Sequence, residues 1–357
     1  MHLNESDLPE GYLNYVWKKM IFLIGSLIFL IFAIAFSVSV GAVNIPLPDV
    51  FNVFLGNAPS STWHTIIWNI RLPQALTGVA AGIGLAVAGV AMQSILRNPL
   101  ASPFTLGISN AGAFGAAFSV MILGTGTMRS RAMDAIVINN PYTTTIVAFI
   151  FCLLATAFIL GIAHIKKASP EVMILAGVAL SSLFTAGTMF LQFFADDVQL
   201  AAVVFWSFGD VARADWRELS IISTVVILAT IYFFLNRWNY NAIDAGDDTA
   251  LGLGVDVTRI RLIGMIVSSL VTAVIVAFLG VIGFVGLVCP HIVRILIGDD
   301  NRFLIPGSIL IGGILLSLSD TAARLVVAPH VLPVAVLTAF MGAPVFIFLL
   351  IKGGRRR

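Results

Sequence analysis

The chain has 357 residues, of which 59% are hydrophobic and only 11% are charged, and its formal net charge is +2 at pH 7. A soluble domain usually contains about 25% charged residues, and the mean hydropathy of this chain is +1.01. These values exclude a water-soluble globular protein, a disordered chain and a nucleic-acid binder. The lipid bilayer is therefore the solvent in which the fold has to be explained.

Long apolar segments predict the fold class, because a helix needs roughly 20 apolar residues to cross a bilayer. Residues 262–290 predict one helix ending near Gly280, a turn over Gly280–Gly283, and a second helix ending near Gly298. With about ten helices in all, we expect an all-α polytopic membrane protein. The segments without Asp, Glu, Lys or Arg are Met20–Asn44, Leu72–Leu96, Asn98–Met128, Ala135–Ile165, Val172–Ala195, Leu219–Asn236, Leu262–Pro290, Phe303–Ser319 and Leu325–Ile351.

These segments predict a single membrane domain over residues 20–351, between an N-terminal tail (1–19) and a basic C-terminal tail (352–357). The first apolar run is too long for a signal peptide and is read as a retained helix. Lys and Arg gather on one side of the predicted bundle, which places both termini in the cytoplasm of a cell-membrane protein. The cations expected on the outer side are Arg71, Arg129, Arg131, Arg213, Arg217 and Arg324.

Motifs for enzymatic chemistry are missing from the sequence. It contains no phosphate-binding loop and no HExxH, CxxC or GxSxG pattern, so no catalytic residue, metal or cofactor is expected. Cys152 and Cys289 lie in apolar runs and predict two buried thiols. Glu171 and Asp320 lie near helix ends, which disfavours an ion-coupled carrier with a carboxylate at mid-depth. Uphill transport would then draw its energy from another chain.

Three stretches stand out from the apolar background. The first begins at Arg71-Leu72-Pro73-Gln74 and ends in the turn Arg97–Pro103, where Asn-Pro and a second Pro break the helix. The second, Gly246–Val255, is either a solvated connector or a short helix with an acidic start and an apolar ridge. The third begins at Gly280–Arg294 and ends near Pro344. It includes Asp320 and Arg324, whose i,i+4 spacing also allows a simple ion pair on one helix face.

Together these stretches resemble the FecCD-type permease family, the membrane subunits of ATP-binding-cassette (ABC) importers for iron(III)-siderophores, haem and cobalamin. The resemblance covers residues 45–352 and implies a type II importer fold like that of the vitamin B12 importer permease. It also implies a dimer with a second permease subunit, two separate ATPase subunits that hydrolyse ATP, and a periplasmic or lipid-anchored substrate-binding protein. The chain itself would be a transport subunit and not an enzyme.

The resemblance assigns roles to particular residues. Outer arginines of the family pair with carboxylates of the binding protein, and Gln74 stands where the family usually has a second arginine. Trp206 and Gly209 resemble a short outer helix near the pathway, and Trp206 would equally suit an interfacial aromatic anchor. The expected residues are Arg71, Gln74 and Arg324 for docking, Gly246, Ala250, Leu253 and Gly254 for ATPase coupling within the loop 237–261, and Asn98, Pro99, Leu100 and Ala101 for a cytoplasmic turn.

Other readings stay open at this point. A secondary transporter of small organic solutes, driven by an ion gradient, is the main alternative, and a channel or membrane scaffold is another. Within the importer reading, iron(III)-siderophore is the preferred cargo, while haem, cobalamin or molybdate are possible. The sequence does not distinguish an identical partner permease from a paralogue.

Overall fold

The computed structural model describes residues 10–41, 43–57, 59–128, 136–138, 141–165, 169–327 and 330–353. In chain order the elements are α1 (Glu10–Ser39), α2 (Leu47–Phe54), α3 (Ser61–Ile66), the π-helix η2 (Ile67–Arg71), α4 (Leu72–Ile95), α5 (Ile108–Met121), β1 (Gly126–Met128), β2 (Ile136–Ile138), α6 (Pro141–Ile165), α7 (Pro170–Phe193), α8 (Asp197–Ser207), the 3-10 helix η3 (Val211–Arg213), α9 (Trp216–Leu235), α10 (Arg237–Asp244), α11 (Asp247–Gly252), α12 (Val257–Leu279), α13 (Val285–Ile297), α14 (Asn301–Leu325) and α15 (Val334–Gly353).

Within these ranges, seven helices are long and apolar enough to cross a membrane. One is the continuous helix Ser61–Ile95, which consists of α3, η2 and α4. The other six are α1, α6, α7, α9, α12 and α14. The shorter apolar helices are α5, α8, α13 and α15. The predicted all-helical polytopic membrane fold is confirmed, while a count of ten crossings, which needs α5, α13 and α15, stays a prediction.

The break predicted within residues 262–290 is confirmed. α12 ends at Leu279 and α13 begins at Val285. Gly280 has a φ of 82°, and a Cβ there would lie 2.6 Å from the backbone oxygen of Trp206, so a side chain has no room. Phe284, directly before α13, has a φ of 66°, which is uncommon for a residue other than glycine. The turn is therefore defined by backbone geometry that apolar composition does not encode.

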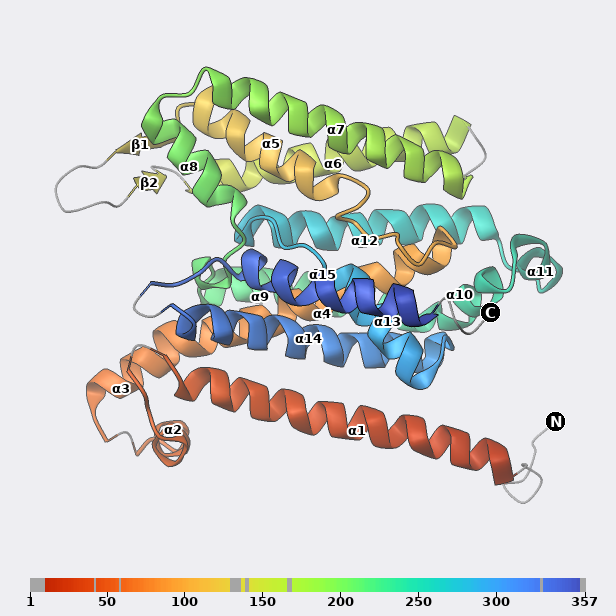
Figure 1. Cartoon of the computed structure of the whole chain (residues 1–357), viewed down its shortest axis with the longest axis horizontal. Coiled ribbons are helices and arrows are strands. Elements are labelled where there is room, and N and C mark those ends of the chain that lie inside the picture. The colour runs from red at the N-terminus through yellow and green to blue at the C-terminus, as the bar shows by residue number, and fades with distance from the viewer. Residues whose placement is uncertain are drawn as a thin grey trace.

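Helix α4 lies in the middle of the bundle (Figure 1), and 89% of the most apolar part of its span is buried. Its glycines allow close approach of neighbouring helices, as small residues do in membrane bundles. A Cβ at Gly82 would overlap the backbone of Gly312 on α14, and one at Gly89 would overlap the backbone of Gly286 on α13. The backbones of three helices are thus in direct contact along α4.

The bundle has two distinct ends (Figure 1). The short helices α10 and α11 lie at one end, together with the start of α1 and the end of α15. The short helices α2, α3 and α8 lie at the other end. We call these the α10–α11 end and the α2–α3 end. An even number of chain crossings between the two ends is consistent with both termini at one end.

The structure differs from the sequence expectations in two segments. Residues 10–19, assigned to a tail, are helical and extend α1, and the apolar segment Asn98–Met128 contains a helix only over Ile108–Met121. Pro99 and Pro103 delay that helix because proline lacks a backbone donor and restricts the residue before it. After α5, β1 pairs with β2 in an antiparallel ladder that composition did not predict.

The cations that lie outside the described residues are Arg129, Arg131, Lys166, Lys167, Arg355, Arg356 and Arg357.

Candidate functional site

The polar segment between α9 and α12 folds into two short helices, α10 and α11, at the α10–α11 end. α11 opens with Asp247 and Asp248, whose carboxylates suit the positive end of a helix dipole. Gly246 and Gly254 stand on either side of it with φ of 125° and 81°, a region that glycine enters without strain. The segment expected as a coupling loop is therefore a defined helical unit.

Of the two apolar residues expected to couple to the ATPase, Leu253 is exposed and Ala250 is not. Ala250 is fully buried in a small apolar cluster with Ala242 and Val257, so it does not contribute to an exposed ridge. The exposed apolar side chains are Leu251, 60% exposed, and Leu253, 69% exposed. Ala250 is buried because it packs α11 against α10 and the start of α12.

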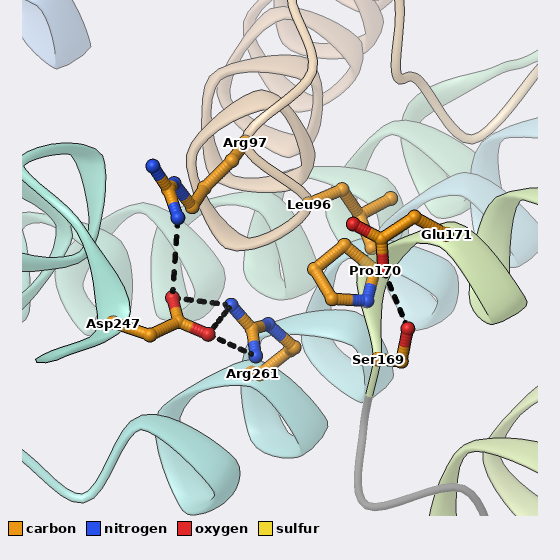
Figure 2. Close-up of a pocket in the computed structure, with 7 residues that line it drawn as sticks. All are labelled: Leu96, Arg97, Ser169, Pro170, Glu171, Asp247 and Arg261. Atoms are coloured by element: carbon orange, nitrogen blue, oxygen red, sulfur yellow. Dashed lines mark hydrogen bonds and ion pairs between the residues drawn. The ribbon is translucent and has the colours of Figure 1, made fainter.

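A cavity of about 540 Å³ lies beside α11 (Figure 2). On one side of it, the Asp247 carboxylate accepts hydrogen bonds from both terminal nitrogens of Arg261, at 3.0 to 3.3 Å. The half-exposed Arg97 guanidinium lies 4.0 Å from the same carboxylate. Glu171, at the start of α7, faces the cavity from another helix and accepts from Ser169. The cavity thus brings opposite charges from four segments together.

The turn after α4 is built around Asn98. Its side-chain oxygen accepts from the backbone N–H of Leu100 at 2.9 Å, and its backbone oxygen accepts from Ala101 at 3.0 Å. An Asx turn of this kind explains the Asn-Pro sequence locally. Ala101 is buried, whereas Leu100 is 45% exposed. The contacts are those of a structural turn, and the role of Pro99 and its neighbours near a pathway stays a prediction.

A second polar cluster joins α10 to the start of α14, and no role was predicted for its members. The Asn241 side-chain oxygen accepts from both the backbone and the side-chain nitrogen of Asn301, at 2.8 and 3.0 Å, and its amide donates to Asp300. Burial opposes ionisation of Asp300, but hydrogen bonds from Arg302 and Asn241 outweigh it and lower its pKa to about 2. The Asp-Asn pair at positions 300 and 301 is a helix-start signal, and only the fold pairs it with α10.

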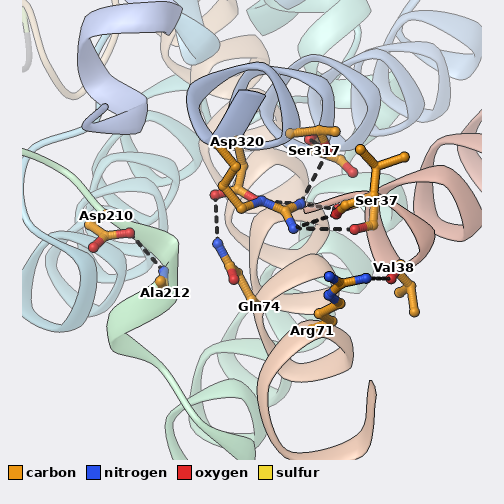
Figure 3. A network of polar contacts seen from close by, with 11 residues as sticks. Ser37, Val38, Arg71, Gln74, Asp210, Ala212, Ser317 and Asp320 are labelled. Atoms are coloured by element: carbon orange, nitrogen blue, oxygen red, sulfur yellow. Dashed lines mark hydrogen bonds and ion pairs between the residues drawn. The ribbon is translucent and has the colours of Figure 1, made fainter. Parts of the chain in front are cut away.

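At the α2–α3 end, Arg71 is directed into the protein (Figure 3). It is only 6% exposed, and its guanidinium donates to the backbone oxygens of Val38 and Ser39, each at 2.9 Å, and of Val43. The last carbonyls of a helix have no partner within the helix. Arg71 supplies that partner for the end of α1.

Arg324 and Gln74 belong to the same network. Arg324 forms an ion pair with Asp320 at 3.1 Å and donates to the backbone and the hydroxyl of Ser37, on α1. Gln74 donates to Asp320 at 3.0 Å, which connects α4 with α14. Both Gln74 and Asp320 are buried. The Arg324–Asp320–Gln74 contacts therefore join α1, α4 and α14, and Arg71 contacts the same end of α1.

Trp206, near the end of α8, is buried inside the protein. Trp206 is 6% exposed, so the interfacial-anchor reading of this side chain is wrong for this structure. Phe208 and Val281 form a parallel β-bridge, and a Cβ at Gly209 would overlap the backbone of Val281. Gly209 is therefore required for the close contact between this segment and the break before α13.

Comparison with known proteins identifies the chain at the family level. The FecCD transport family profile matches residues 29–352. The chain belongs to the FecCD transport family. A Methanocaldococcus jannaschii protein named as an ABC transporter permease is 53% identical over 350 residues, covering 98% of this chain and 99% of the relative. The haemin transport permease of Yersinia pestis is 35% identical over 337 residues, with 94% and 97% coverage.

A solved structure supports the same assignment. It is described as an inward-facing conformation of a metal-chelate type ABC transporter, and it matches with a TM-score of 0.80 and 28% identity over 92% of this chain and 98% of that one. The FecCD assignment makes the chain homologous to permeases for haem, vitamin B12 and siderophores. It is a multi-pass permease subunit with a type II importer fold, not an enzyme, and it implies ATPase and binding-protein partners. An ion-driven carrier is excluded.

The residues expected to dock the binding protein are engaged in contacts within the chain. Arg71, Gln74 and Arg324 are occupied within the chain, where they neutralise helix-end carbonyls and a buried carboxylate. In this structure they do not form an exposed row for another protein. The simple ion pair of Arg324 with Asp320, which the spacing allowed, is the arrangement observed.

The chemistry of the FecCD chain agrees with a transport role. Cys152 and Cys289 are buried free thiols, as predicted. Among the described residues, no three His, Cys, Asp or Glu side chains are grouped so that they could hold a metal ion. A chelate carries its own ligands for the metal, so a pathway for it does not require protein ligands.

Proposed function

We propose that this FecCD permease translocates a metal chelate, most specifically an iron(III)-siderophore, across the cell membrane. The α10–α11 end faces the cytoplasm, together with both termini, because most Lys and Arg residues within the described ranges lie at that end. Two copies, or this chain and a paralogue, form the pathway. Two ATPase subunits bind below and a substrate-binding protein docks at the α2–α3 end.

One observation carries the proposed coupling to the ATPase: Leu251 on α11 and Leu253 directly after it are exposed to solvent on a helical unit that is anchored by polar contacts. An exposed apolar pair on a short helix suits a groove on a partner protein. The relatives named for haemin and for iron(3+)-hydroxamate import support the chelate class. They do not by themselves select one chelate, so the siderophore assignment needs its own test.

The test is uptake by proteoliposomes that contain the complete transporter, with its own ATPase and binding protein. A ferric hydroxamate siderophore, haemin and cyanocobalamin are offered separately, with and without ATP inside the vesicles. We expect ATP-dependent accumulation of the ferric siderophore. Accumulation of haemin or cobalamin alone would overturn the siderophore assignment, and accumulation without ATP would overturn the ATP-driven mechanism.

A further inference from the structure

Three consecutive residues in the last turn of α4 each contact a different element through a polar group. The Gln93 side-chain oxygen accepts from Arg294 on α13 at 3.0 Å, and the Ser94 hydroxyl donates to Asp244 on α10 at 3.0 Å. The Ile95 backbone oxygen accepts from Nε of Arg261 on α12 at 2.6 Å. All three α4 residues are buried. The end of α4 is thus joined to α10, α12 and α13 at once.

Arg261 occupies a special position in this arrangement. Its terminal nitrogens bind Asp247 at the start of α11, while its Nε binds the last residue of α4, and the side chain is only 3% exposed. A guanidinium can do both because its donors point in fixed, different directions, whereas a lysine ammonium cannot. Arg261 therefore connects α11 to α4 through a single rigid group.

Asn241 provides a second connection from the same helical unit. Its side-chain oxygen takes two hydrogen bonds from Asn301, which is fully buried at the start of α14. α14 in turn lies against α4 without intervening side chains where Gly82 meets Gly312. Asn241 thus connects α10 to α14, which packs directly on α4.

The opposite end of α4 is held in the same manner. Gln74 binds Asp320 on α14, and Arg71, directly before α4, holds the end of α1 and the oxygen of Val43 beyond it. Between the two sets of contacts, α4 is one uninterrupted helix, 89% buried over the most apolar part of its span. A close-packed helix between two such attachments transmits displacement, because packed interiors shift between discrete arrangements and do not deform gradually.

We propose that α4 transmits movement of the α10–α11 unit to the α2–α3 end, and that Arg261 and Asn241 are the positioning residues for this transfer. The inference rests on the proposed function, in which the ATPase subunits move α10 and α11. Arg261 contacts α4 and Asp247, and Asn241 contacts the start of α14. Their role is to ensure that closure of the ATPase pair rearranges the segment that follows α1.

The test is hydrogen–deuterium exchange of the complete transporter in nanodiscs, with and without trapping by ATP and vanadate. Peptides from residues 247–252 report α11, and peptides from residues 43–57 report the segment attached through Arg71. The variants are Arg261→Lys, which keeps the charge but cannot bridge, and Asn241→Ala. Matched controls are Arg259→Lys, exposed on the same helix as Arg261, and Asn239→Ala, whose amide donates to Asn236 directly before α10.

We expect trapping to change exchange in both segments of the wild type and of both controls. In the Arg261 and Asn241 variants the change at 247–252 persists, while the change at 43–57 falls about tenfold, as expected when coupling between two sites is lost. Thermal unfolding of each variant confirms that the bundle is intact. An undiminished response at 43–57 in both variants, or a wild type that responds only at 247–252, overturns this inference alone. A wild type that responds in neither segment would instead contradict ATP-driven movement itself.

Discussion

At the scale of single residues, buried charges in this permease complete the hydrogen bonding of helix ends. Arg71 is the clearest case, since it serves three carbonyl oxygens at and beyond the end of α1. Val38 and Ser39 are buried, and a buried acceptor left without a hydrogen bond costs about 1–3 kcal/mol. The arginine therefore belongs to the fold, whatever other protein docks nearby.

Substitution of Arg71 by alanine is expected to destabilise the protein by about 3 kcal/mol, because several charge-assisted hydrogen bonds are lost together. The measurement is thermal unfolding in detergent. Arg217→Ala, at an exposed position of the same end, is the matched control and should leave the midpoint nearly unchanged. Equal stability of the Arg71 variant and wild type, with weaker binding-protein docking, would restore the docking role for Arg71.

The ionisation of Asp300 should make the stability of the fold depend on pH. Its pKa is lowered from 3.8 to about 2, so its contacts with Arg302 and Asn241 stabilise the fold fully above pH 3.8 and lose their effect as the pH falls toward 2. Asp300→Asn should therefore be less stable than wild type at pH 7, and the difference should shrink at pH 3. Chemical unfolding at both pH values measures this. A difference that stays constant between them would contradict the assigned ion pair.

At the scale of helices, contact between backbones decides how α4 is packed. The overlap that a Cβ at Gly89 would have with Gly286 shows that no side chain fits between α4 and α13. By contrast, a Cβ at Gly161, on α6, would meet nothing within 4 Å. The two glycines lie in helices of similar composition, and only their neighbours distinguish them.

We predict opposite effects for alanine at these two glycines. Gly89→Ala should destabilise the bundle by about 3 kcal/mol, since overpacking forces the helices apart. Gly161→Ala should stabilise it by up to about 1 kcal/mol, because alanine is the better helix former. Unfolding midpoints of both variants in one detergent provide the comparison. A Gly89 variant as stable as the Gly161 variant would show that α4 and α13 are less closely packed than described.

At the scale of the whole molecule, the exposed pair on α11 defines where a partner can act. Leu251 on α11 and Leu253 directly after it have exposed apolar side chains, while Ala250 packs the helix against its neighbours. Buried apolar anchors typically dominate the energy of a protein interface. We therefore place the ATPase contact on these two leucines.

Leu253→Asp is expected to reduce co-purification of the ATPase subunit about tenfold, because a charge would be buried in the contact, and to uncouple ATP hydrolysis from transport. Leu253→Met keeps the apolar area and serves as the control, with wild-type behaviour expected. Coupled uptake that survives the aspartate substitution would show that α11 does not carry the contact.

The fold was largely predictable because its signals are local. Lengths of apolar sequence predict helices, and the glycines of residues 280–283 predict the break that separates α12 from α13. Motifs such as Arg71–Gln74 and Gly246–Gly254 predicted the family, which the comparisons confirm. The short ladder β1–β2 and the late start of α5 were missed, because apolar composition does not separate these conformations.

The sequence by itself determined that this chain is a helical FecCD permease in a membrane. The lengths of its apolar segments and its family motifs can be recognised from the order of the residues alone. The tertiary structure decided what the polar residues do. Arg71 and Arg324 turn inward because the end of α1 leaves carbonyls without partners, and Arg261 and Asn241 acquire a role because folding brings α4, α11 and α14 together. Such partners lie far apart along the chain, so only the packed bundle reveals them.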